Sequence, residues 1–289
     1  MRWEMGRRSQ NVEDRRGMGP AGFGRGVRVG GMGGLGILAV ALIAMFLGVD
    51  PSVILNSVPM QQTEPAVVRG GPPPGGDREA DFVSAVLAQT EDSWSAIFAQ
   101  AGRRYQEPQL VLFNGGVQSA CGIAGSATGP FYCPGDQKLY IDLSFFDELD
   151  QRFGAPGDFA QAYVIAHEVG HHVQTLLGIT GEVDRMRRQV DQAAANRLSV
   201  MMELQADCFA GVWARRTHET QGMLERGDVE EGLGAASAVG DDRIQKATRG
   251  YVVPDAFTHG SSQQRMRWFT QGLESGDINA CDTFNASQL

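Results

Sequence analysis

Two histidines and a glutamate stand together in the segment His167-Glu168-Val169-Gly170-His171, and their types and spacing can hold a metal ion. Residues four apart in an α-helix share one face, about 6 Å apart at Cβ, so His167 and His171 can bind one Zn²⁺. Glu168 is adjacent to a ligand but rotated off the ligand face. We therefore expect it to act as general base on a zinc-activated water that attacks a carbonyl group.

A second pair of residues four apart, Glu203 and Asp207, lies in a segment rich in large apolar side chains. Buried carboxylates need a cationic or metal partner. A catalytic zinc takes three protein ligands and keeps a fourth position open. One of the two carboxylates can be the third ligand, and the other can accept the free N–H of a ligand histidine and fix its orientation. We expect one Zn²⁺ per chain.

Helical patterns surround both motifs. Apolar residues at helical spacing predict a helix over 79–101, and a second helix carries the histidines and is closed by Gly178. A third helical stretch runs over 182–216, with a break near Asn196. Capping boxes predict three helix starts, at Asp158 with Gln161, at Asp228 with Glu231, and at Ser261 with Gln264.

Strand patterns are fewer. Gln109–Phe113 is typical of a short buried strand, and 131–133 with 138–143 predict a hairpin around Pro134-Gly135. The fold class is therefore α+β, mainly helical, with a small β-sheet. An exposed edge at Lys138–Leu143 can bind an extended peptide by strand addition, but a hairpin enclosed in the core gives the same pattern.

The chain divides into four parts by composition. Residues 1–34 are rich in Gly and Arg, which predicts a disordered cytoplasmic segment. Residues 35–49 are apolar, in an uncharged run that starts at 30, and favour one transmembrane signal anchor over the alternative of a cleaved signal peptide. Residues 50–78 form a Pro/Gly linker. Arginines before the apolar run and Asp50 after it place the domain 79–289 outside the cytoplasm.

The charge of the chain narrows the kinds of molecule that the protein is expected to bind. The chain has 289 residues and a net charge of −9, although residues 1–34 are basic. An acidic body argues against nucleic acid as a partner. The expected partners are a peptide or protein substrate and, through 35–49, a lipid bilayer.

The four cysteines, Cys121, Cys133, Cys208 and Cys281, all lie in the part predicted to be outside the cytoplasm. An even count in an oxidising compartment favours two disulfides over buried free thiols. Three pairings are open. Cys121 with Cys133 is the local choice, and it leaves Cys208 with Cys281.

The blocks AHEVGHHVQ, ELQADCFAGVWA, GPFYCPGDQKLYIDLSFF and THGSSQQRMRWF together resemble the bacterial neutral zinc metallopeptidases, which are single-span membrane proteins of the zincin type. The resemblance covers residues from about 79 to 289. A weaker likeness extends to the CAAX-processing and heat-shock-associated membrane zinc peptidases, which share HExxH, a distal ExxxD and a later His with an Arg six residues on.

The resemblance implies that Glu203 is the zinc ligand and Asp207 the partner of a ligand histidine. It also places His259 and Arg265 at the active site. His259 lies in a loop before a capped helix, where it can stabilise an oxyanion or protonate a leaving amine, and Arg265 can hold substrate. The sequence thus predicts a membrane-anchored zinc peptidase. The alternative is a non-catalytic, zinc-stabilised envelope scaffold, which would have no need of Glu168.

Overall fold

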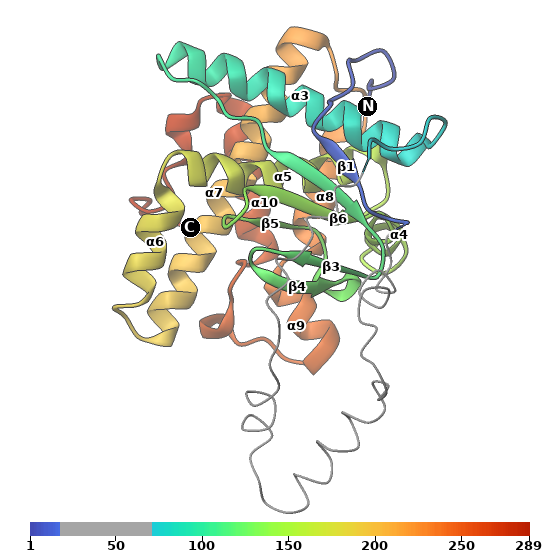
Figure 1. Cartoon of the computed structure of the whole chain (residues 1–289). Coiled ribbons are helices and arrows are strands. Elements are labelled where there is room, and N and C mark those ends of the chain that lie inside the picture. The colour runs from blue at the N-terminus through green and yellow to red at the C-terminus, as the bar shows by residue number, and fades with distance from the viewer. Residues whose placement is uncertain (18–70) are drawn as a thin grey trace, which may run out of the picture. The chain divides into compact units, whose positions relative to one another are not determined.

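Residues 1–17 and 71–289 are the part of the chain that the computed structural model describes (Figure 1), and its strands are grouped before residue 143, with a long run of helices after it. The strands there are β1 (Val12–Asp14), β2 (Gln109–Phe113), β3 (Gly116–Ser119), β4 (Gly122–Gly125), β5 (Phe131–Cys133) and β6 (Lys138–Asp142). The helices are α3 (Arg78–Gln100), α4 (Ser144–Gln151), α5 (Asp158–Leu176), α6 (Ile179–Arg187), α7 (Gln192–Gln221), α8 (Asp228–Ala238), α9 (Asp241–Arg249) and α10 (Ser262–Ser275), with 3₁₀ turns η2 (Ser126–Thr128), η3 (Pro254–Ala256) and η4 (Ile278–Cys281). The predicted mainly helical α+β class is confirmed.

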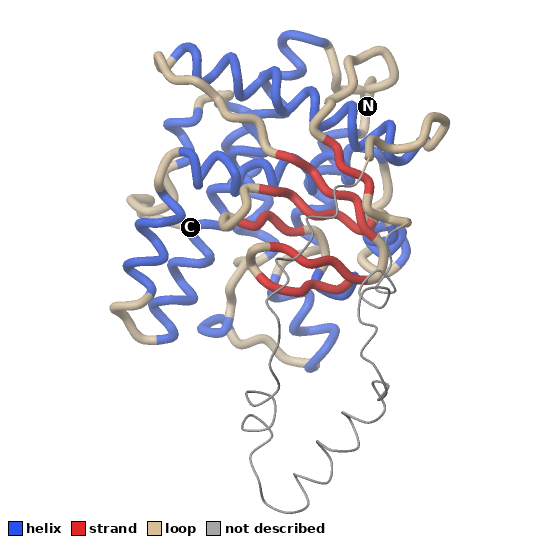
Figure 2. Tube along the Cα trace, in the orientation of Figure 1, coloured by secondary structure: helices blue, strands red, loops and turns tan. Residues whose placement is uncertain are grey.

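The central sheet has the strand order β1-β2-β6-β5 (Figure 2). β2 pairs in parallel with both β1 and β6, and β5 pairs antiparallel with β6. Successive side chains in a strand point to opposite faces. Leu110 and Ile141 therefore join the large helical core, whereas Val111 and Tyr140 join a smaller cluster with the β3–β4 hairpin. Burial on both faces explains the unbroken apolar runs in the sequence.

The predicted hairpin is confirmed as β5 and β6, with Phe131 opposite Tyr140. β6 is also hydrogen-bonded to β2 along its whole length. Lys138–Leu143 is therefore enclosed, as the second of the two interpretations predicted. Within the described residues, β5 is the end strand of this sheet.

Two of the three predicted capping boxes are wrong. Glycines occupy the N-cap positions of α5 and α8, and the carboxylates of Asp158 and Asp228 instead contact the Met1 ammonium. Ser261 and Gln264 do form the predicted box at α10. α7 runs unbroken for 30 residues, so the break predicted near Asn196 is also wrong, and the interruption falls earlier, between α6 and α7.

Close helix crossings set the geometry around the two motifs. A Cβ placed on Gly211 of α7 would lie 2.1 Å from the Phe269 carbonyl oxygen of α10, and one on Gly272 would lie 1.9 Å from that of Cys208. A Cβ on Gly170, beside His171, would lie 3.0 Å from Ala206 of α7. Only glycine permits backbones this close, so α7 is held between α5 and α10.

The expectation of disorder over 1–34 is wrong for residues 1–17. β1 pairs with β2, and Trp3 packs edge-to-face on Phe82 with ring centroids 5.3 Å apart. Two of the arginines that suggested a solvated tail pair with acidic groups of α3, Arg7 with Glu91 at 2.7 Å and Arg8 with Asp81 at 2.6 Å. Residues 18–34 lie outside the described residues. Because β1 is part of the sheet, residues 1–17 cannot lie across a membrane from the domain, so the predicted opposite placement conflicts with this fold.

Among the described residues, no helix combines the length and the apolar character needed to span a membrane. The predicted anchor 35–49 lies outside the described residues. Of the predicted linker 50–78, residues 71–77 are described, and Asp77 caps α3. All four cysteines are paired as the local choice predicted, Cys121 with Cys133 and Cys208 with Cys281.

Candidate metal centre

Side chains from α5 and α7 converge as the two motifs predicted. Nε2 of His167 lies 3.1 Å from Oε2 of Glu203, and Nε2 of His171 lies 3.5 Å from Oε1 of the same carboxylate. One donor atom of each residue lies within 4.8 Å of the other two. The side chains come from successive turns of α5 and one position of α7, which the crossing at Gly170 brings together.

The Nδ1 atoms of His167 and His171 are hydrogen-bonded to buried side chains. Nδ1 of His167 lies 2.8 Å from Oδ1 of Asp207, and Nδ1 of His171 lies 2.8 Å from Oε1 of Gln174. Both partners are acceptors, so each Nδ1 carries a proton and donates it. Each Nε2 can then bind a metal ion once it loses its own proton, and the resulting Nδ1–H tautomer is the one that a metal ligand requires.

The charges of this group suit a cation. Burial alone would lower the pKa of His167, but the charge and hydrogen bond of Asp207 and the hydrogen bond to Glu203 raise it to about 9. Burial alone would raise the pKa of Glu203, yet the charge of His171 and the hydrogen bonds of both histidines hold it well below its usual value. The site therefore favours positive charge between these groups. Two imidazoles and one carboxylate are ligands that Zn²⁺ prefers, so the residues fit zinc.

Asp207 is fully buried and is held by three donor groups besides Nδ1 of His167. Arg265 gives it two hydrogen bonds, Nε to Oδ2 at 2.8 Å and Nη2 to Oδ1 at 2.9 Å, and Tyr163 donates its hydroxyl proton to Oδ1. The predicted role of Asp207 as partner of a ligand histidine agrees with this geometry. Arg265 is only 4% exposed and is committed to Asp207, so its placement argues against the predicted contact with substrate.

Glu168 differs from His167 and His171 in its contacts with the rest of the protein. Within the described residues its carboxylate makes no hydrogen bond or ion pair, although the residue is only 8% exposed. Burial raises the pKa of this carboxyl, and the charges of His167 and His171 partly oppose the rise. A buried carboxylate without a protein donor is suited to take a proton from a reactant.

His259 stands in the loop before α10, as predicted, and Asp241 at the start of α9 holds it. Oδ2 of Asp241 accepts the backbone N–H groups of Thr258, His259 and Gly260 at 2.6–3.1 Å, and its Oδ1 lies 3.3 Å from the imidazole Nδ1. The hydrogen bond with Asp241 raises the pKa of His259, and the charge of Glu203 adds to the rise. The imidazole is half exposed.

Sequence reasoning missed three residues that hold these side chains, namely Gln174, Tyr163 and Asp241. Gln174 follows His171 by three positions and Tyr163 precedes His167 by four, so both share a helix face with a histidine, and that spacing was the available signal. Asp241 offered no signal, because it meets its loop across 17 to 19 residues. His172 faces away from the centre, as predicted, but is fully buried, with Nε2 2.7 Å from the Gln106 carbonyl oxygen.

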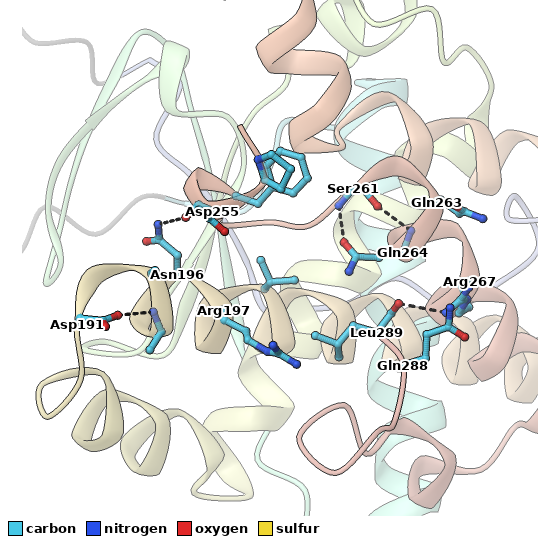
Figure 3. A pocket seen from close by; sticks show the side chains of 15 residues that line it. Asp191, Asn196, Arg197, Asp255, Ser261, Gln263, Gln264, Arg267, Gln288 and Leu289 are labelled. Carbon is cyan, nitrogen blue, oxygen red and sulfur yellow. Dashed lines mark hydrogen bonds between the residues drawn. The ribbon is translucent and has the colours of Figure 1, made fainter. Parts of the chain in front are cut away.

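A pocket of about 870 Å³ lies elsewhere, between the N-terminal half of α7, the loop before α10 and the last residues of the chain (Figure 3). Arg267 donates to the Leu289 carbonyl oxygen at its border, at 3.1 Å. None of the three metal-binding side chains lines it. The pocket is therefore separate from the metal centre.

A helix-borne HExxH pair completed by a glutamate from a second helix defines a metal site of the zincin type. The chain belongs to the family described as "Putative neutral zinc metallopeptidase", which matches residues 1–284 and so includes the N-terminal strand. It is 51% identical over 290 residues to the uncharacterized protein YpfJ of Escherichia coli K12, covering 99% of this chain and all of that one. It is 43% identical over 259 residues to the uncharacterized protein Rv2575 of Mycobacterium tuberculosis H37Rv, covering 85% and 86% of the two chains. No solved structure matches it.

Proposed function

We propose that the chain is a zinc-dependent peptidase in which His167, His171 and Glu203 bind one Zn²⁺ and Glu168 is the general base. The observation that carries the proposal is the contrast within one site: three donor atoms converge, while the neighbouring buried carboxylate of Glu168 has no hydrogen-bond or ion-pair partner within residues 1–17 and 71–289. A scaffold that uses zinc only for stability has no need of such a carboxylate.

Each residue has a distinct task in this proposal. Zinc bound here would supply Lewis acidity and would lower the pKa of water to about 7. Glu168 accepts the proton of the attacking water and passes it to the leaving amine. Asp207 and Gln174 keep Nε2 of each histidine directed at the metal. Arg265 neutralises the buried charge of Asp207, which would otherwise be costly.

His259 is the proposed donor to the developing oxyanion or to the leaving amine. Its raised pKa keeps the imidazole protonated at neutral pH more often than a free histidine, and Asp241 fixes the loop that carries it. Donors fixed in advance stabilise transition-state charge without reorganisation.

The proposed substrate is a peptide that lies extended beside β5. This strand is the end of the central sheet within the described residues, and it is packed on α5, the helix that carries the histidines. An extended chain can extend a sheet by backbone hydrogen bonds at such an edge.

The proposed location is an oxidising compartment outside the cytoplasm, since two disulfides persist under such conditions. Residues 1–17 then share that compartment with the domain. The apolar segment 35–49 remains the predicted contact with a lipid bilayer. Mass spectrometry of non-reduced peptides from native membranes tests the location, and four free thiols would contradict it.

The test of function compares the wild-type full chain with Glu168→Gln on a peptide library, with zinc content measured for both. We expect cleavage by the wild type alone and near one zinc per chain in each. Cleavage-site profiling of membranes from the same two strains would then identify the substrate. A wild type that binds zinc but cleaves no peptide would favour the scaffold.

A further inference from the structure

Gln174 lies one turn after His171 on α5 and is fully buried. Its Oε1 accepts from Nδ1 of His171 at 2.8 Å, and its Nε2 donates to the Met202 carbonyl oxygen at 2.7 Å. A backbone carbonyl can only accept, so it fixes which end of the amide is nitrogen. The amide oxygen must therefore face His171, and Nδ1 of that histidine must carry the proton.

A second glutamine continues the chain of hydrogen bonds. Nε2 of Gln174 also donates to Oε1 of Gln205 on α7 at 3.1 Å, and Nε2 of Gln205 donates to the Cys281 carbonyl oxygen at 3.0 Å. Every bond in this chain points the same way, from His171 through two amides. Because the Met202 and Cys281 carbonyl oxygens can only accept, only one orientation of each amide satisfies all of these bonds.

The far end of the chain is firmly held. Cys281 is 1% exposed and is bonded through its disulfide to Cys208 of α7. Two residues further on, the Thr283 hydroxyl donates to the Met201 carbonyl oxygen at 2.7 Å. The C-terminal end of the 3₁₀ turn η4 is thus fastened twice to α7, the helix that supplies Glu203.

We propose that Gln174 and Gln205 are positioning residues for the metal ligand His171, and that η4, held by the Cys208–Cys281 disulfide, is the fixed end of their hydrogen-bond chain. The inference rests on the proposed zinc site. It assigns the C-terminal disulfide a part in metal binding, because loss of that anchor frees the Gln205 amide to turn and removes one of the two acceptors that hold the Gln174 amide in its orientation toward His171.

The test measures zinc affinity of the full chain by competition with a chelator, together with the visible spectrum of the Co²⁺-loaded protein. Gln174→Leu removes the acceptor at similar volume, and we expect zinc affinity to fall about 10- to 100-fold, with an altered Co²⁺ spectrum. Gln205→Leu should weaken affinity less, since the Met202 carbonyl still holds Gln174. Gln174→Glu, which keeps an acceptor for Nδ1, should recover most of the loss.

Two matched controls separate positioning from general stability. Gln89→Leu changes an equally buried glutamine on α3, outside the site, and should leave zinc affinity unchanged. The double variant Cys208→Ser with Cys281→Ser should lower zinc affinity, whereas Cys121→Ser with Cys133→Ser should not. Thermal unfolding identifies any variant that fails to fold, and Gln205→Leu then decides in place of Gln174→Leu.

The outcomes distinguish this inference from the function on which it rests. A wild type without zinc affinity overturns both. A wild type that binds zinc, with Gln174→Leu and Gln205→Leu equal to Gln89→Leu, overturns the positioning role alone. Loss of affinity in both double cysteine variants alike would overturn the special part of the C-terminal disulfide. None of these results depends on whether a peptide is cleaved.

Discussion

Helix α5 carries two clusters of metal-binding side chains, and they differ in what already neutralises them. Asp158 at its start meets Asp228 and Glu231, and His167 in its middle meets His171 and Glu203. The first cluster holds the Met1 ammonium, 2.8 Å from Asp158 and 3.3 Å from Asp228. Beside the second lies the Arg265 guanidinium, with its Nη2 3.5 Å from Nε2 of His167, but the ion pair of this side chain is with Asp207.

The difference shows that proximity alone does not make a metal site. At the first cluster, Glu231 accepts the backbone N–H of Phe159 and Asp228 that of Glu225, so the carboxylates already have donors. At the second, both Glu203 oxygens face only the Nε2 atoms of the two histidines, whose protons a metal ion can displace. Donor atoms that face one another, and not acidic residues as such, distinguish the proposed zinc site.

The largest expected effect comes from removing the shared carboxylate. Glu203→Ala should reduce zinc from near one per chain to almost none and abolish hydrolysis, because two imidazoles alone bind zinc weakly. Metal analysis of the purified full chain measures this, with Asp228→Ala as the matched change at the other cluster. Equal zinc content in Glu203→Ala and wild type would end the assignment.

The second largest expected effect is a loss of turnover while zinc stays bound. Glu168→Gln should lower kcat about 10²- to 10⁴-fold, the usual contribution of a general base, with zinc still bound. Peptide turnover and zinc content are measured on the same sample. If Glu168→Gln lost its zinc or kept wild-type turnover, Glu168 would not be the base.

Asp207→Asn should act through His167. An amide can present its N–H to the imidazole, so we expect zinc affinity or activity to fall about 10- to 100-fold. Arg265 would be left buried without its counter-charge, and the free energy of unfolding should drop by about 3–5 kcal/mol. Chelator competition and denaturant unfolding measure the two effects. Unchanged zinc affinity would show that Asp207 serves packing alone.

Zinc affinity should depend on pH. His167 has a pKa raised to about 9, so it is protonated at neutral pH and must lose that proton to bind metal. Affinity should therefore rise about tenfold per pH unit up to 9. The stability of the zinc-free protein should change with pH in the opposite direction. The charged His167 imidazole stabilises the fold fully below pH 6.5, and this stabilisation is lost as pH rises through 9. Thermal unfolding measured across pH with and without zinc checks both expectations. A thermal stability that depends on pH in the same way with and without zinc would contradict them.

The smallest effect belongs to the cluster at the start of α5. Asp228→Asn removes one charge near the buried Met1 ammonium but keeps an acceptor and leaves Asp158 in place, so the free energy of unfolding should fall by about 1–3 kcal/mol. Zinc content and turnover should not change. A loss of zinc in Asp228→Asn would mean that the two clusters are coupled along the helix.

The sequence predicted those features of the site that depend on spacing within one helix. His167 with His171, and Glu203 with Asp207, needed only the four-residue repeat, and the buried strand Gln109–Phe113 followed from its apolar run. Helices α5 and α8 do begin at Asp158 and Asp228, but the capping boxes predicted there were wrong, because both carboxylates contact a partner more than 150 residues away along the chain. Gln205 was also missed, because its partners lie 31 and 76 residues away.

The pairing of β1 with β2 also has a consequence for the order of folding. Val12 lies opposite Leu110, so the first strand to be synthesised waits for a partner made almost a hundred residues later. Closing so long a loop costs chain entropy before any stabilising contact forms, so such pairings form slowly. We expect β2, β6 and the helices behind them to assemble first and residues 1–17 to dock last, which makes the first strand to leave the ribosome the last to enter the sheet.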